Sequence, residues 1–433
     1  MKKSIFWHRR DLRTEDNAGL FKALQTGNLV QPIFIFDKSI LDKLPSNDQR
    51  VLFIFKYVKK LKEAYQNLGS DLCVFYGNPL EIIPQIAKEN GFEAVFTNRD
   101  YEPYASERDK AIYEKLKELN IEFLGTKDHV IFEKNEVTKD DEKPYTVFTP
   151  YSRKWKAKLN ASHMESYPVE KYLQNLIPNN EKQLMISLAE MGFESQQLFP
   201  FPEENVAHEI IQKYSEQRNF PSIPGTSKLS VHLRFGTISI RNLARIASQT
   251  NETFLNELIW RDFYQMVIFH FPYTTKSAFK PVYDRIEWER NELHFQSWCE
   301  GKTGYPLVDA GMRELNETGF MHNRVRMIVA SFLTKHLLLD WRLGEAYFAE
   351  KLMDFELASN IGGWQWAAGC GCDAAPYFRV FNPQSQQEKF DKEFKYIKKW
   401  VPEYGSHSYP KPIVEHKFAR DRVLNRYKSA LNQ

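Results

Sequence analysis

The first 124 residues alternate short apolar runs with amphipathic stretches, and this alternation is the feature that most constrains the fold. Strands are predicted at 4–8, 30–36, 71–76, 93–97 and 121–124, which are rich in β-branched and aromatic side chains. Helices are predicted at 17–26, 47–68, 79–90 and 104–119. Strands alternating with helices of this length predict a doubly wound, Rossmann-like α/β domain with a parallel sheet. The G-x-G-x-x-G fingerprint is absent, so nothing here indicates NAD.

The pattern changes after residue 132. Between 133 and 200 the periodicity weakens and polar, proline-containing stretches appear, which predicts a long connector. From 201 onward the pattern is almost wholly helical, with apolar residues three and four apart in 255–269, 325–339 and 346–357. We therefore expect an α/β domain over 1–132, a connector over 133–200 and a larger all-α domain over 201–433.

Length and composition predict a globular protein with more than one core. A chain of 433 residues with 42% hydrophobic side chains is longer than one core usually organises. Its longest apolar stretches are shorter than the roughly 18–20 residues that a transmembrane helix needs. The N-terminal residues lack the continuous apolar core of a secretory signal. We expect a soluble, cytoplasmic protein.

Cysteine usage predicts neither crosslinks nor a metal site. The chain has four cysteines, Cys73, Cys299, Cys370 and Cys372. The last two are spaced C-x-C, without a second Cys or His cluster to complete a tetrahedral zinc site. We expect no disulfide framework and no metal.

Charge and tryptophan are both unevenly distributed. The net charge is +3, and the second half of the chain carries the excess of basic residues. That balance suits a polyanionic partner, although a solvated surface explains it about as well. Seven of the nine tryptophans lie from Trp260 onward. Such a concentration is commonly core, but it also serves stacking or electron transfer.

The segment 225–230 places small hydroxyl residues and a lysine behind a Pro-Gly turn, just before a predicted helix. Hydroxyls, free backbone N–H groups and a helix start suit a phosphate or diphosphate. Taken alone, an ordinary helix N-cap explains this segment better than a ligand site.

Four polar or aromatic residues share one face of the predicted helix at 255–269. Glu257, Trp260, Arg261 and Tyr264 stand at i, i+3, i+4 and i+7. The face is interpreted either as an exposed Glu257–Arg261 pair beside a half-buried Trp, or as a cavity wall that meets a nucleic-acid base. On spacing alone the exposed pair is favoured.

Two later segments carry further candidates. Residues 321–327 open a helix that places Asn323 and Met327 on one face, with Arg324 directed elsewhere and able to reach a phosphate. Residues 354–366 combine two acids, Asn360, a glycine pair and two tryptophans. We interpret them as the end of a helix with a glycine C-cap. A ligand site and plain packing explain this second segment equally well.

Taken together, these segments resemble the photolyase/cryptochrome family over essentially the full length of the chain, and most closely the class I photolyases of cyclobutane pyrimidine dimers. The motifs that carry the resemblance are 9–13 with Asp16 and Asn17, 145–151, 301–306, 322–324, 364–366 and 373–379. The resemblance implies an α/β antenna domain followed by a helical domain that holds FAD in a bent conformation. It also implies light-driven electron transfer from reduced FAD to a dimer flipped out of ultraviolet-damaged DNA.

The resemblance selects the residues that would hold FAD. Arg326 and Asp354 match an ion pair beside the flavin, and Asn360 matches the residue that faces flavin N5. The other implied cofactor residues are Tyr214, Thr226, Ser227, Lys228, Leu229, Ser230, Phe254, Arg261 and Glu356. Two of them depart from the family pattern, because relatives usually have Asp where this chain has Glu356 and often Trp where it has Phe254.

The resemblance also selects catalytic and DNA-binding residues. Trp364, Trp341 and Trp288 match a chain of tryptophans from the flavin to the surface, and Glu257 with Asn360 completes the catalytic set. The implied DNA-binding residues are Arg218, Glu257, Trp260, Asn323, Arg324, Met327, Trp366 and Arg379. Relatives that repair (6-4) photoproducts carry paired histidines around Asn323 and Met327, so cyclobutane dimers are favoured.

Several expectations stay open beside this one. The alternative function is a blue-light cryptochrome that signals without chemistry, and a third is a DNA-binding flavoprotein that has lost catalysis. A second, antenna chromophore is expected to be a deazaflavin or a flavin rather than folate, because 101–107 lacks the Asn-Glu pair of folate-binding relatives. The family resemblance implies a monomer.

Overall fold

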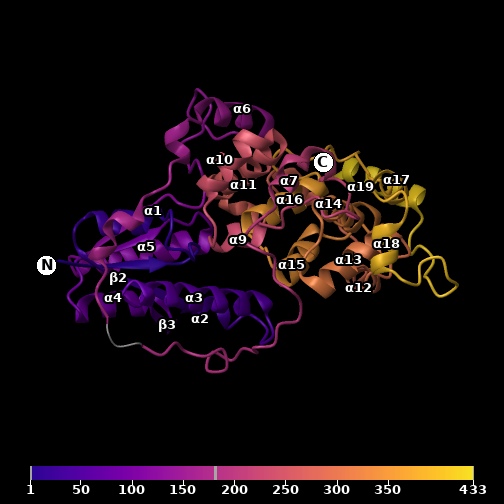
Figure 1. Cartoon of the computed structure of the whole chain (residues 1–433). Coiled ribbons are helices and arrows are strands. Elements are labelled where there is room, and N and C mark those ends of the chain that lie inside the picture. Colours follow the sequence, from indigo (N-terminus) through magenta and orange to yellow (C-terminus); the bar gives the residue numbers. More distant parts are fainter. Residues whose placement is uncertain (1, 180–182, 433) are drawn as a thin grey trace. The chain divides into compact units, whose positions relative to one another are not determined.

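A computed structural model describes residues 2–179 and 183–432 (Figure 1). The chain divides into two compact units, and neither is continuous in sequence. The first is made of the described residues within 1–133, 158–205 and 228–249, and the second of those within 134–157, 206–227 and 250–433. The segment predicted as one connector over 133–200 is therefore shared between both units.

The first unit contains the predicted parallel sheet. Its strands are β1 (Lys3–His8), β2 (Leu29–Asp37), β3 (Cys73–Gly77), β4 (Ala94–Asn98) and β5 (Glu122–Thr126), in the order β3-β2-β1-β4-β5. All four pairings are parallel, with Trp7 of β1 opposite Ile33 on one side and Thr97 on the other. The prediction of five strands in a Rossmann-like layout is confirmed, and each strand lies within two residues of its expected place.

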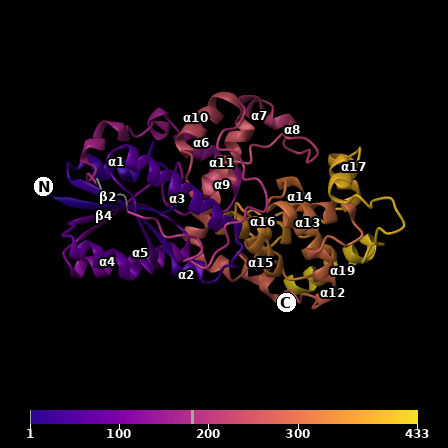
Figure 2. The same ribbon diagram turned by 60° about the horizontal axis from the view of Figure 1, so that its bottom comes forward.

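Helices cover both faces of this sheet (Figure 2). One face packs against α1 (Ala18–Gln25) and α3 (Gln49–Asn67), through side chains that include Phe6 and Phe34. The other packs against α4 (Pro79–Glu89) and α5 (Pro103–Glu118), through side chains that include Ile5 and Val95. Successive residues of one strand thus enter different cores, as the period of two in a strand requires. The short α2 (Lys38–Leu41) follows β2.

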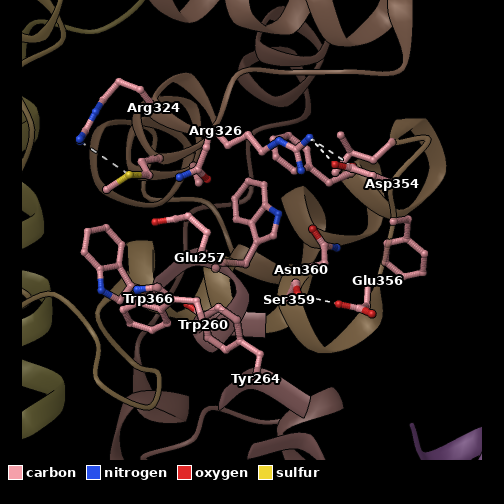
Figure 3. A pocket seen from close by; sticks show the side chains of 18 of the residues that line it. Glu257, Trp260, Tyr264, Arg324, Arg326, Asp354, Glu356, Ser359, Asn360 and Trp366 are labelled. Atoms are coloured by element: carbon pink, nitrogen blue, oxygen red, sulfur yellow. Dashed lines mark hydrogen bonds and ion pairs between the residues drawn. The ribbon is translucent and has the colours of Figure 1, made fainter. Parts of the chain in front are cut away.

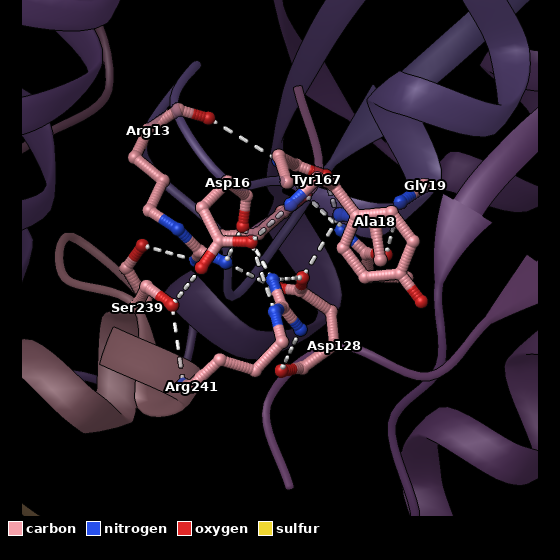
Figure 4. Close-up of polar contacts among 12 residues, drawn as sticks. Arg13, Asp16, Ala18, Gly19, Asp128, Tyr167, Ser239 and Arg241 are labelled. Atoms are coloured by element: carbon pink, nitrogen blue, oxygen red, sulfur yellow. Dashed lines mark hydrogen bonds and ion pairs between the residues drawn. The ribbon is translucent and has the colours of Figure 1, made fainter. Parts of the chain in front are cut away.

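A buried ionic network joins the later part of the first unit to its beginning (Figure 4). Arg241, on α10 (Ile240–Thr250), donates to Asp16 at 2.9 Å and to Asp128 at 2.8 Å. Arg13 donates to the other oxygen of Asp128 at 2.7 Å. Burial alone would raise the pKa of Asp128, but Arg13 and Arg241 hold it well below its usual range. The network explains why 228–249, with α9 (Ser230–Phe235), belongs to the α/β unit.

The second unit is helical, as expected. Its helices include α6 (Phe148–Lys158), α7 (His208–Gln212), α8 (Tyr214–Gln217), α11 (Glu252–His270), α12 (Glu292–Cys299), α13 (Pro306–Thr318), α14 (Asn323–Ser331), α15 (Trp341–Lys351), α16 (Leu357–Ala368), α17 (Pro383–Phe390), α18 (Lys395–Trp400) and α19 (His416–Leu431). A π-helical turn, η5 (Phe332–His336), follows α14. The core is built around Trp298, Phe332, Trp341 and Trp364. Among the described residues, no helix is long and apolar enough to cross a membrane.

One sequence-based helix assignment is wrong. The glycine pair was interpreted as the C-cap of a helix over 346–357, but α15 ends at Lys351 and both glycines lie inside α16. The residue that caps the C-terminus of α16 is Gly369, in the left-handed region at a φ of 86°. Packing explains Gly362, because a Cβ there would stand 2.3 Å from the ring of Tyr264, whereas a Cβ on Gly363 would meet nothing within 4 Å.

Candidate cofactor and substrate site

The helical unit encloses a cavity of about 370 Å³ (Figure 3). This volume lies within the usual range for small-molecule sites. Side chains from α11, α14, α15, α16 and the segment between α15 and α16 converge on it, together with Arg218. Its lining residues are Arg218, Glu257, Trp260, Tyr264, Asn323, Arg324, Arg326, Met327, Ala330, Phe348, Leu352, Asp354, Phe355, Glu356, Ser359, Asn360, Gly363, Trp364 and Trp366.

Helix α11 supplies one wall of the cavity. Glu257, Trp260 and Tyr264 line it, as expected for residues at i, i+3 and i+7. The favoured interpretation of an exposed Glu257–Arg261 pair is wrong. Glu257 accepts a hydrogen bond from Nη1 of Arg218, and Arg261 turns away to donate to Glu356 at 3.1 Å. Partners from other segments compete successfully with the i, i+4 neighbour.

The electrostatics around Glu257 differ from those of a surface acid. Burial raises the pKa of its carboxyl, and the cation of Arg218 only partly opposes that shift. A carboxyl with a raised pKa keeps its proton to a higher pH than a surface carboxyl does.

A second ionic group lies on the α14 side of the cavity. Nη2 of Arg326 donates to both oxygens of Asp354, at 3.2 and 3.0 Å, so the pair expected from the sequence forms. Glu356 lies two residues further on, at the N-cap of α16, where it accepts from Ser359 at 3.0 Å as well as from Arg261. Glu356 therefore connects the start of α16 to α11 through side chains, without a capping hydrogen bond to the backbone of α16.

Asn360 has a partner that sequence reasoning missed. Its Nδ2 donates to the backbone oxygen of Glu345 at 3.0 Å and to Oε1 of the same residue at 2.9 Å. Because both neighbours accept, the amide nitrogen must face Glu345 and the amide oxygen is left for the cavity. Glu345 lies on another helix, fifteen positions earlier, so no local sequence pattern predicts the contact.

The surroundings of Asn360 leave room for a flat ring system. A Cβ on Gly363 would meet no atom within 4 Å, so the glycine leaves that side of the cavity open. Trp364 is buried, and its indole N–H has no hydrogen-bond partner among the described residues. An amide oxygen, an open glycine and an ion pair suit a heterocycle with polar edges, and the residues present fit a flavin.

Four further candidates line the same cavity, but the prediction that Arg324 is directed away from Met327 is wrong, because its Nη1 donates to Sδ of Met327 at 3.7 Å. Asn323, Arg324, Met327 and Trp366 all line the cavity, together with Trp260 and Glu257. Burial lowers the pKa of Arg324, and the nearby cations of Arg218 and Arg379 lower it further. The three arginines therefore lie close enough to repel one another, which favours binding of an anion between them.

The other candidates do not line the cavity. Arg379 is exposed, and its guanidinium lies 5.3 Å from the ring of Phe381. Tyr214 and Phe254 pack edge to face at 5.0 Å. Thr226 and Ser227 belong to the helical unit, whereas 228–230 belong to the α/β unit. The roles of Tyr214, Phe254, Arg261 and 226–230 in cofactor binding stay predictions.

The three tryptophans of the expected electron path occupy different environments. Trp364 lines the cavity, Trp341 is buried in the core, and the half-buried Trp288 packs edge to face on Tyr427 at 6.1 Å. Trp364 itself contacts the fully buried Trp298 at 6.0 Å. Their order as an electron path stays a prediction.

Among the described residues, no group of three His, Cys, Asp or Glu side chains is placed to hold a metal ion.

An α/β unit followed by a helical unit with a cavity suited to a flavin defines a class of two-part flavoprotein. The family model of the FAD-binding domain of DNA photolyase matches residues 254–408, and the DNA photolyase model matches 4–170. A deoxyribodipyrimidine photo-lyase of Synechococcus is 36% identical, over 99% of this chain and 97% of its own length. The chain belongs to the DNA photolyase family.

Solved structures agree with this assignment. A bacterial class III photolyase from Agrobacterium tumefaciens superposes with a TM-score of 0.87 at 31% identity, covering 100% of this chain and 98% of its own. An archaeal photolyase from Sulfolobus tokodaii, solved with two FAD molecules, gives 0.81 at 34%, covering 99% and 100%. A cryptochrome from Synechocystis gives 0.85 at 26%, covering 98% and 99%.

Proposed function

We propose that this protein is a light-driven DNA-repair lyase that splits cyclobutane pyrimidine dimers, with FAD as its cofactor. One observation carries the proposal: a single cavity is lined by a flavin-compatible group around Asn360 and by a base-compatible group around Glu257 and Trp260. A ligand on one side is thus adjacent to a ligand on the other. That adjacency is what a photochemical electron transfer requires.

On the cofactor side of the cavity, polar side chains would hold the edge of the flavin ring. Asn360 would face flavin N5 with its amide oxygen, and the Arg326–Asp354 pair would lie beside the ring. When bound and reduced, FAD would supply the light-driven electron donation that splits the dimer. The protein excludes water from this region with Phe348, Leu352 and Trp364.

The substrate side would hold an extruded pyrimidine pair. Glu257 would hydrogen bond to the polar edge of the bases, while Trp260 and Trp366 would line its apolar face. Extrusion of the target is the general behaviour of enzymes that act on a base, and a poorly stacked dimer costs less of the few kcal/mol that flipping requires. Arg218, Arg324 and Arg379 would bind the flanking phosphates.

The test is to illuminate the flavin-loaded, chemically reduced protein with an oligonucleotide that contains thymine dimers. We expect thymine absorbance to recover under blue light and to stay constant in the dark. Replacing Trp364 by Phe should slow light-driven reduction of oxidised flavin, yet spare repair once dithionite has reduced it. A yellow, DNA-binding protein that restores no thymine would exclude the lyase function.

A cryptochrome is the second candidate, because the Synechocystis cryptochrome shares the whole fold. Asn360 and the residues around Glu257 favour repair over signalling alone. The same illumination experiment separates the two, since a photoreceptor changes its flavin spectrum without restoring thymines.

An antenna chromophore, a monomeric state and a cytoplasmic location complete the proposal. A flavin is a reasonable antenna, because the Sulfolobus tokodaii photolyase was solved with two FAD molecules. Two flavins per chain on extraction, and a single-chain mass in sedimentation, would support the first two points.

A further inference from the structure

The segment 145–151 carries the family motif, but the proposed function gives it no role. None of its residues lines the cavity. The segment leads into α6, which is fastened to α11: the indole N–H of Trp155 donates to Asp262 at 3.0 Å, and the ring of Tyr151 lies 5.2 Å from that of Phe263. Helix α6 therefore backs the helix that carries Glu257 and Trp260.

Phe148, the first residue of α6, stacks directly on Trp260. The ring centroids lie 3.7 Å apart and the planes are within 4° of parallel. Trp260 is half-buried and lines the cavity. Phe263 also meets the indole edge to face at 5.6 Å, and the ring of Tyr264 lies 5.4 Å away with a tilt of 34°, so a ligand can reach the part of the indole that these rings leave to the cavity.

Phe148 is itself held by two contacts. Its ring meets Phe263 edge to face at 5.9 Å. Its backbone N–H donates to Oδ2 of Asp373 at 3.0 Å. The first N–H groups of a helix have no partner within the helix, so a carboxylate at this point caps α6 from outside.

Asp373 also fixes the start of the segment that carries Arg379. Its φ is 52°, in the left-handed region that Asp and Asn tolerate better than most residues. Next to it, the Cys372 thiol lies 3.1 Å from the backbone oxygen of Thr146. The carboxylate of Asp373 therefore connects Phe148, which stacks on Trp260, with the segment 373–379.

We propose that Phe148 is a positioning residue for damage recognition, which holds the indole of Trp260 in the plane that receives the apolar side of a pyrimidine dimer. The inference rests on the proposed function, because it requires a dimer in the cavity. A free indole must be ordered when the ligand binds, and that cost appears as lost affinity. Undamaged DNA, which leaves no base in the cavity, does not depend on the indole.

The test compares Phe148→Leu with Phe148→Tyr in the full-length, flavin-loaded protein. The measurement is the Kd for a single-stranded oligonucleotide with one thymine dimer and for its undamaged equivalent. Loss of stacking and of pre-ordering should weaken dimer binding about tenfold in Phe148→Leu, with undamaged binding within about twofold. Phe148→Tyr keeps the ring and should match the parent.

Matched variants separate positioning from general damage to the fold. Val147→Ala, at an exposed neighbour, should behave as the parent. Asp373→Ala should shift the discrimination between damaged and undamaged DNA in the same direction as Phe148→Leu. Asp373→Asn keeps an acceptor and the left-handed backbone, so its discrimination should stay nearer that of the parent. If Phe148→Leu releases flavin, Phe148→Met and Asp373→Ala carry the comparison.

Three other outcomes are informative. Unchanged discrimination between damaged and undamaged DNA in Phe148→Leu, Phe148→Met and Asp373→Ala would overturn the inference, and so would an equal loss for both oligonucleotides. A parent protein that binds both oligonucleotides alike would instead contradict the proposed function, leaving the two failures distinguishable.

Discussion

At the scale of single residues, Glu257 shows how burial and one neighbour set the chemistry of a side chain. Arg218 donates to it, and burial raises its pKa. Replacing Glu257 by Ala should lower the repair yield per absorbed photon about tenfold, because a hydrogen bond to a charged group contributes roughly 1.5–3 kcal/mol. The repair yield of Glu257→Gln should lie between that of the parent and that of Glu257→Ala. Flavin absorbance should stay unchanged in both, and an unaltered yield in Glu257→Ala would remove the residue from catalysis.

Glu345 is the residue whose importance depends on another side chain. It fixes the amide orientation of Asn360 by accepting twice from Nδ2. Glu345→Leu removes the side-chain acceptor but leaves the backbone oxygen, so it should hold the amide less firmly and shift the midpoint potential of bound flavin, measured by spectroelectrochemistry. Glu345→Gln keeps an acceptor and should shift it less. Identical potentials in all three proteins would show that the orientation of Asn360 does not matter to the cofactor.

Part of the site was predictable from residue spacing, and part was not. Glu257, Trp260 and Tyr264 share a helix face by period alone, and all three line the cavity. Arg261 has the same spacing but binds Glu356, ninety-five positions away. Spacing fixes the direction of a side chain within its helix. It does not fix which distant segment arrives there.

At the scale of elements, Gly344 of α15 lets the indole of Trp364 on α16 approach the α15 backbone closely. A Cβ on Gly344 would stand 2.1 Å from Cη2 of Trp364, so Gly344→Ala must displace the indole. We expect a loss of about 1–3 kcal/mol in unfolding free energy, as overpacking usually costs. We also expect slower light-driven flavin reduction. Thermal and chemical unfolding with flash photolysis measures both.

Gly363→Ala is the matched control on the partner helix. A Cβ there meets nothing within 4 Å, and alanine favours a helix over glycine by roughly 0.5–1 kcal/mol. This variant should unfold at the same or a higher temperature. A comparable destabilisation by both substitutions would show that close packing at Trp364 is not the cause.

At the scale of the whole molecule, buried neutral histidines set the acid side of the stability profile. Burial lowers the pKa of His336 to about 3 and that of His322 to about 4, with neighbouring positive groups adding to both shifts. The unfolded chain takes up these protons near pH 6.5 while the native protein does not, so stability is lost as pH falls from 6.5 towards 4. Each histidine contributes a slope of up to about 1.4 kcal/mol per pH unit.

Denaturant unfolding between pH 4 and 7 measures this slope. His336→Gln should remove one histidine's share, leaving a shallower profile. A slope equal to that of the parent would show that His336 has the same protonation state in the native and the unfolded protein.

DNA affinity is the second property that we predict at the scale of the whole molecule. Binding should weaken with salt, because phosphate contacts release counterions. Arg324→Gln should reduce the slope of log Kd against log salt by about 0.7 for single strands. Lys417→Gln, at an exposed position on α19, should leave it unchanged. Equal slopes in all three proteins would exclude a phosphate contact at Arg324.

The sequence by itself determined the α/β sheet, the helical second half and the face of α11, because hydrophobic period and residue spacing are local properties that survive any tertiary arrangement. The tertiary structure alone decided that 228–249 packs with the sheet, through Arg241 and Asp128, and that Glu345 holds Asn360. It also stacked Phe148 on Trp260. Those contacts join residues from 15 to more than 110 positions apart, and only packing of whole elements brings such side chains within hydrogen-bond or ring-contact distance.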